Sequence, residues 1–297
     1  MQNAIREIKL TLVRVEPTEA EVWLSVYPER LTSTTQAVGR LMGPRCRYAS
    51  TVEVAYPWRE RSRQIDKERG PMILSRVIIP EPCLWDPISP FLYEGVIELW
   101  EDNLTCMRAE VSCGLCHAKL VPRGLRWNGK PISVLGVERS SFEESEVAGL
   151  RLKGFNTLLL PARKITHSAL HEADHVGLLL IGRVETNADV EHALGLADHP
   201  SMLGWLADQN STQSDNGLEP ILKNLLKTGR LVGLDLRSNQ STNLASPVDF
   251  LMCDEELLPA FERVAAPKLI YCESRIEQRQ DDHAAPAPSG VLGWIHS

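Results

Sequence analysis

The side chains best placed to act on a bound molecule stand at the ends of two apolar runs. The segment DHPSMLGWLADQN, residues 198–210, closes on Asp208, Gln209 and Asn210, and the segment PKLIYCE, residues 267–273, closes on Glu273. A carboxylate can accept or release a proton, whereas an amide cannot serve as an acid. The sequence therefore offers Glu273 for chemistry and places amides at the end of the other run.

A second pattern, Cys113-Gly-Leu-Cys116-His117, has the CxxCH spacing by which c-type haem is attached. No export signal is visible and the segment lies in a strand-rich region, so we expect a chance spacing. A thioredoxin-type motif would open a helix, and no helical period follows Cys116. Further zinc ligands at compatible spacing are missing. We therefore expect seven reduced cysteines, no metal and no other cofactor.

The composition of the chain is that of an ordinary globular protein. It has 297 residues, a formal net charge of −7 and 43% hydrophobic residues, which gives room for two domains. The one basic stretch, residues 59–69 (RERSRQIDKER), also carries acids and is expected to be a solvated loop, so nucleic-acid binding gets no support. Neither a signal peptide nor an apolar run of about 18 residues occurs, which predicts a cytoplasmic protein that does not enter membranes.

Residues 1–120 read as short apolar, partly alternating runs separated by turn residues, which is typical of β-strands. Such spacing indicates an immunoglobulin-like β-sandwich. The seven expected strands are 5–15, 21–27, 36–42, 51–56, 72–79, 92–100 and 105–113.

Residues 121–297 change to short strands alternating with helical segments, which indicates βα units and a parallel sheet. Eight strands imply a (β/α)8 TIM barrel, shortened because that fold usually takes about 250 residues. The last strand nearly reaches the end of the chain, so a closing helix is not expected and an apolar flank could face a second copy or a partner chain. The expected strands are 131–137, 156–160, 178–181, 202–206, 231–236, 250–253, 268–272 and 291–295. The expected helices are 143–153, 166–175, 189–196, 219–227 and 257–264.

Five segments resemble motifs of family 2 glycoside hydrolases, the β-galactosidase, β-glucuronidase and β-mannosidase group. Residues 84–93 (LWDPISPFLY) are similar to a sandwich-domain signature, and residues 128–139 (NGKPISVLGVER) are similar to the entry into the first barrel strand. Residues 153–157 (KGFNT) with 173–179 (ADHVGLL), and the HPS…W segment at 199–205, resemble later strands. The resemblance spans nearly the whole chain in the expected order.

The resemblance implies a retaining mechanism with one carboxylate as nucleophile and a second as acid/base, about 5 to 5.5 Å apart. It puts the nucleophile on Glu273 and the acid/base on Asn210, which is substituted. Asp208 or Asp215 could in principle supply the missing carboxyl. Four further positions where the family has polar or charged groups carry other residues here, namely Ser140, Leu159, Ala162 and Arg183.

Other candidate site residues have two interpretations each. Trp294, Arg139, Gln209 and Trp205 are the expected substrate-binding residues, although an aromatic side chain in a barrel more often fills its core. Glu273 could be a nucleophile, but an ion pair with Arg183 or Arg275 is favoured. Asn156 is expected to be structural.

These observations predict a catalytically impaired glycoside hydrolase family 2-like protein, a pseudoenzyme, retained for binding a carbohydrate or a protein. One alternative is an active retaining β-glycosidase with Glu273 as nucleophile. The other is a scaffold module, in which the shortened barrel forms a homo-oligomer or docks on a partner chain.

Overall fold

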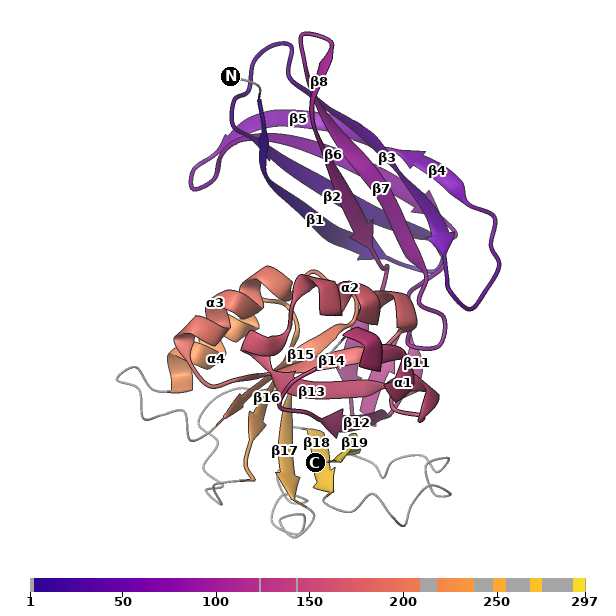
Figure 1. Ribbon diagram of the computed structural model, residues 1–297, viewed down its shortest axis with the longest axis vertical. Helices are drawn as coiled ribbons and strands as arrows, with labels where there is room; N and C mark the ends of the chain where they lie inside the picture. The colour runs from indigo at the N-terminus through magenta and orange to yellow at the C-terminus, as the bar shows by residue number, and fades with distance from the viewer. Residues whose placement is uncertain are drawn as a thin grey trace. The chain divides into compact units, whose positions relative to one another are not determined.

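The computed structural model describes residues 3–122, 124–142, 144–208, 218–237, 248–254, 268–273 and 291–296, and only the backbone of 144, 268–273 and 291. The chain separates into two compact units, Met1–Cys116 and His117–Ser297 (Figure 1). The first is a β-sandwich and the second contains a parallel barrel sheet. The coarse fold expected from the sequence is thus confirmed.

The sandwich consists of two four-stranded antiparallel sheets, ordered β1-β2-β6-β5 and β4-β3-β7-β8. Alternating strands bury one face, as in β2, where Val22, Leu24 and Val26 have no exposed surface. The strands are β1 (Ile5–Val15), β2 (Glu19–Pro28), β3 (Gln36–Arg45), β4 (Val54–Pro57), β5 (Arg59–Asp66), β6 (Gly70–Pro80), β7 (Leu92–Glu101) and β8 (Leu104–Cys113).

The loop expected at residues 59–69 was wrong, because β5 pairs with β6 over this segment. Most β5 side chains are exposed, so the strand has no buried apolar face for sequence patterns to reveal. β5 lies at the edge of its sheet, where charged side chains discourage pairing with other molecules. The sandwich therefore has eight strands, against the seven expected.

In the second unit, eight parallel strands form a closed ring. All eight expected barrel strands are present, with ends shifted by a few residues. They are β12 (Val134–Glu138), β13 (Thr157–Pro161), β14 (Leu179–Val184), β15 (Met202–Asp208), β16 (Leu231–Asp235), β17 (Phe250–Asp254), β18 (Lys268–Glu273) and β19 (Val291–His296). A small sheet that was not expected precedes them: β9 (Ala118–Val121), β10 (Gly124–Trp127) and β11 (Lys130–Ile132).

Helices within the described residues follow β12 to β15 and lie together along that side of the barrel (Figure 1). They are α1 (Val147–Leu152), α2 (His167–Val176), α3 (Asn187–Leu196) and α4 (Leu218–Leu226), with short 3-10 turns η1 (Glu144–Glu146) and η2 (Ala162–Lys164). Within this described part, none is long and apolar enough to cross a membrane. The helix expected at 257–264 lies outside the described residues.

Local sequence explains where two helices begin. Thr166 caps α2 by accepting from the Ala169 N–H, and Thr186 and Asp189 form a capping box at α3. α2 ends at Gly177, whose φ of 74° suits glycine. The outward faces of the strands and these helices share one apolar core, in which Leu158, Leu180 and Leu222 are buried.

Candidate functional site at the carboxyl end of the barrel

Four charged side chains lie at the carboxyl ends of the barrel strands, where catalytic groups of such barrels are found. Glu138 and Asp235 end β12 and β16, Arg183 is the penultimate residue of β14, and Arg237 follows β16 closely. Their strand neighbours Val137, Val184 and Leu234 belong to the core on the helix side. Because side chains alternate along a strand, Glu138, Arg183 and Asp235 face the barrel interior.

The four side chains form one ion-pair network. Arg237 Nη1 donates to Glu138 Oε2 at 2.7 Å, and Arg237 Nη2 and Nε donate to Asp235 at 2.6 and 2.9 Å. Arg183 Nη2 donates to Glu138 Oε1 and lies 3.5 Å from Asp235 Oδ2. Two guanidinium groups thus bridge two carboxylates across strands that are far apart in the sequence.

The network is largely shielded from solvent. Side-chain exposure is 7% for Asp235 and 18 to 20% for the other three. Burial alone would lower the pKa of Arg237, but hydrogen bonds and charge from Asp235 and Glu138 outweigh it and raise that pKa. The buried Nε of Arg183 has no hydrogen-bond partner within the described residues.

Two of the predicted carboxylate residues, Asp208 and Glu273, end strands at the same edge of the sheet. β18 ends at Glu273, but its side chain lies outside what the structure describes. Asp208 ends β15, half-buried, and its register partner on β16 is Asp235. The structure does not describe Gln209, Asn210, Asp215 or Arg275. The pairing of Glu273 with Arg275 therefore remains a prediction. The described ion-pair partners of Arg183 are Glu138 and Asp235.

The two candidate tryptophans pack in the core. Trp205 is completely buried, and its Nε1 donates to Thr228 Oγ1 at 3.2 Å beyond the end of α4. Its ring thus has no exposed face for a sugar. Trp294 is half-buried and packs against the same helix-side core, whereas its neighbour Ile295 faces Gly136. Arg139 is exposed, and its backbone N–H donates to the Leu159 carbonyl at 2.9 Å.

Positions where the resemblance implies polar groups are apolar or exposed here. Leu159 and Ala162 are fully buried, and Ser140 is exposed. Leu159 alternates with two residues of the helix-side core, Leu158 and Leu160, so it contributes an apolar side chain to the barrel interior.

Several motif residues tie elements together. The buried Asp174 of α2 accepts from His199 Nδ1 at 2.7 Å and from the Ser201 N–H at 3.0 Å, which anchors the segment before β15. Asn156 accepts from the Leu135 N–H at 2.8 Å and donates to the Ser133 carbonyl at 2.7 Å. These bonds give Asn156 the structural role expected from the sequence.

Sequence reasoning missed Glu138, Asp235 and Arg237. Their position in the sequence could have indicated them, since each lies at or just beyond the end of an apolar strand and the carboxyl ends of parallel strands meet at one edge of the sheet. Glu138 lies within residues 128–139, where the resemblance to family 2 gives it no role.

The CxxCH segment begins at the final residue of the last sandwich strand. Cys113 ends β8 and is buried, and burial, with a smaller effect of Cys116, raises the pKa of its thiol to about 12. A protonated thiol is a poor nucleophile and a poor metal ligand.

Comparison with known proteins supports the fold. No family model matches the chain. A β-galactosidase of Oenococcus oeni is 30% identical over 89 residues, which cover 29% of this chain and 8% of that protein. Among solved structures, a family 2 glycosyl hydrolase from Bacteroides cellulosilyticus has a TM-score of 0.73 at 16% identity, covering 99% of this chain and 46% of that one. The Parabacteroides merdae β-glucuronidase has a TM-score of 0.69 at 13% identity, covering 99% and 47%.

The resemblance to family 2 glycoside hydrolases is thus confirmed at the level of the fold. The chain spans less than half the length of these solved structures and a small part of the β-galactosidase.

Proposed function

We propose that this chain is a family 2 glycoside hydrolase-like protein whose barrel mouth binds a ligand without hydrolysing it. The ion-pair network supports this proposal. Both Glu138 and Asp235 have oxygens engaged by guanidinium donors, so neither is placed to protonate or attack a glycosidic bond. The four charges also satisfy one another within the space where a substrate of such a barrel would bind.

The residue type at the acid/base position supports the same proposal. Asn210 cannot donate a proton as a carboxylic acid can, and loss of general-acid help typically lowers rates by about 10² to 10⁴-fold. The apolar Leu159 also removes a group that could hydrogen-bond to a sugar hydroxyl.

We propose a carbohydrate as the ligand, with a protein partner as the competing occupant. Arg183 is the candidate contact, because a fifth of its side chain is exposed and its guanidinium group can donate to sugar hydroxyls. Ligand-observed NMR with galactose, glucose, mannose and glucuronic acid tests this. Binding should be lost in Arg183→Ala and retained in Arg163→Ala, whose arginine is 58% exposed in a separate ion pair. If no sugar binds, the carbohydrate assignment is wrong.

A second candidate is an active retaining β-glycosidase. It is favoured by one observation, that β18 ends with Glu273 at the same edge of the sheet as Asp208. In that case Glu273 would be the nucleophile and Asp208 would have to replace the missing acid. Assays on activated glycosides separate the two candidates, since such substrates do not need acid help for the first step.

A further inference from the structure

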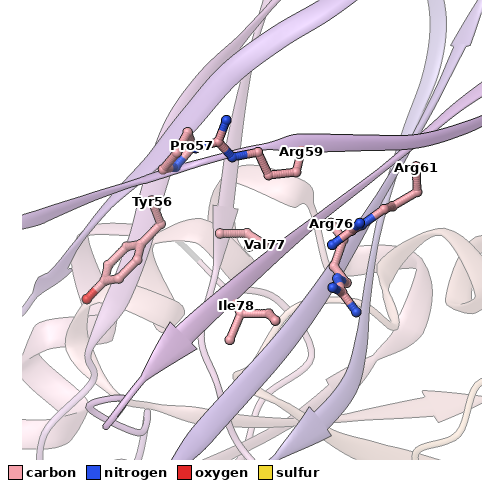
Figure 2. Close-up of a pocket in the computed structure, with 7 residues that line it drawn as sticks. All are labelled: Tyr56, Pro57, Arg59, Arg61, Arg76, Val77 and Ile78. Carbon is pink, nitrogen blue, oxygen red and sulfur yellow. The ribbon is translucent and has the colours of Figure 1, made fainter.

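A hollow of about 260 Å³ opens on the sandwich where the chain passes from β4 to β5 (Figure 2). It lies within the first unit and uses none of the residues of the barrel mouth. Its lining combines three arginines with apolar and aromatic groups: Tyr56, Pro57, Arg59, Arg61, Arg76, Val77 and Ile78.

The strand register concentrates positive charge in this hollow. Arg59 on β5 lies directly opposite Arg76 on β6. Like charges in directly opposed positions destabilise a sheet. The register then shifts between Glu60 and Ser62, so Arg61 is the extra residue of a bulge, which re-aims a side chain. In Figure 2, Arg61 extends towards Arg76, while Arg59 turns towards Pro57.

Nearby acids offset only part of this charge. Glu21 Oε1 lies 3.3 Å from Arg76 Nη1, and the same oxygen accepts from Trp23 Nε1 at 2.8 Å. Glu60, between the two β5 arginines, is bonded instead to Arg63 at 2.8 Å. Within the described residues, Arg59 and Arg61 have no acidic partner. The hollow thus carries three positive charges and one shared negative charge.

We propose that this hollow binds the oxyanion group of a small ligand, such as a carboxylate, sulfate or phosphate. A guanidinium group presents a planar fork of N–H donors that matches such groups in two-point contacts. Tyr56 and Ile78 add apolar surface against which the rest of the ligand can lie. The volume is near the lower end for small-molecule sites, which suits a ligand the size of an acidic monosaccharide.

Calorimetric titration of the full chain at low ionic strength tests the proposal. The probes are inorganic sulfate, inorganic phosphate, glucuronic acid and glucose, where the last lacks the charged group. In Arg183→Ala, which lacks the proposed sugar contact of the barrel mouth, anions should bind and glucose should not, and added salt should weaken the anion binding. The double variant Arg59→Gln/Arg61→Gln should lower anion affinity about tenfold or more, since each lost charge-assisted contact is strong.

Arg108→Gln is the matched control, because it removes an exposed arginine of β8 in the other sheet, which is bonded to Glu98. It should leave the affinity unchanged. Tighter binding of glucuronic acid than of the inorganic anions would assign an acidic sugar, and equal binding would assign the oxyanion alone. The proposal is overturned if no anion binds, or if the folded double variant binds like the wild type. Arg183→Ala should not affect this binding, so the outcome is independent of the barrel mouth.

Discussion

At the scale of single residues, the barrel mouth is defined by which charges pair. The sequence predicted an ion pair of Glu273 with Arg183 or Arg275, and the described partners of Arg183 are Glu138 and Asp235. Alternation along a strand predicts which side chains face the interior, but the choice among inward partners depends on strand order and register around the ring. Glu138 is 45 residues from Arg183 and 99 residues from Arg237 in the sequence, so no local pattern encodes these two pairings.

Replacing Arg237 by leucine should destabilise the protein, because Asp235 and Glu138 would keep their charges and lose most of their donors. We expect a loss of about 1 to 3 kcal/mol in the free energy of unfolding, measured by urea denaturation. Arg163→Leu is the control, since its contact with Glu185 at 3.6 Å is exposed and should contribute less than about 1 kcal/mol. Equal losses in the two variants would mean that the network does not stabilise the fold.

The thiol of Cys113 should be unreactive in the folded protein. Burial raises its pKa to about 12, so at pH 8 it stays protonated, whereas in the unfolded chain it ionises near its usual value of about 8.5. The same difference predicts that its contribution to stability is lost as the pH rises from about 9 towards 12. Mass spectrometry after brief iodoacetamide treatment should find Cys46 modified and Cys113 intact. Rapid native labelling of Cys113 would revive a redox or haem role.

At the scale of elements, apolar runs predicted the strands well where burial determines the sequence. Barrel strands such as β13 and β14 were expected because their residues are buried on both faces, which gives continuous apolar runs. β5 was missed for the opposite reason, since its pairing with β6 is made by the backbone while its side chains stay in water. β9, β10 and β11 were missed because three or four residues are too few to show a period.

Packing between β14 and β15 leaves no room at Gly182. A Cβ added there would lie 2.5 Å from Trp205 Cζ3, within a core that is fully buried. Gly182→Ala should therefore lower the free energy of unfolding by about 1 to 3 kcal/mol. Gly195→Ala is the matched control, because nothing lies near its Cβ position on α3 and alanine favours helix. Thermal denaturation should show a lower Tm for the first variant and an unchanged or higher Tm for the second; the reverse order would contradict the packing described.

At the scale of the whole molecule, the fold could be predicted and the site only in part. The order of the motifs predicted a sandwich followed by a parallel barrel, and solved structures with the same fold confirm this despite 13 to 16% identity. The substituted positions could be read directly, since Asn210, Leu159 and Ala162 are visible in the sequence. The network of four charges that replaces the lost groups could not be predicted, because it depends on the order and register of the strands around the barrel.

Hydrolysis of activated aryl glycosides tests the central claim most directly. Dinitrophenyl galactoside, glucoside, mannoside and glucuronide should be assayed with the full chain and with Glu273→Ala. We expect release of the phenol at the buffer rate with both proteins, because the described carboxylates of the network are held by arginines within the space where a substrate of such a barrel would bind. Turnover by the wild type that disappears in Glu273→Ala would contradict the claim and identify an active retaining glycosidase.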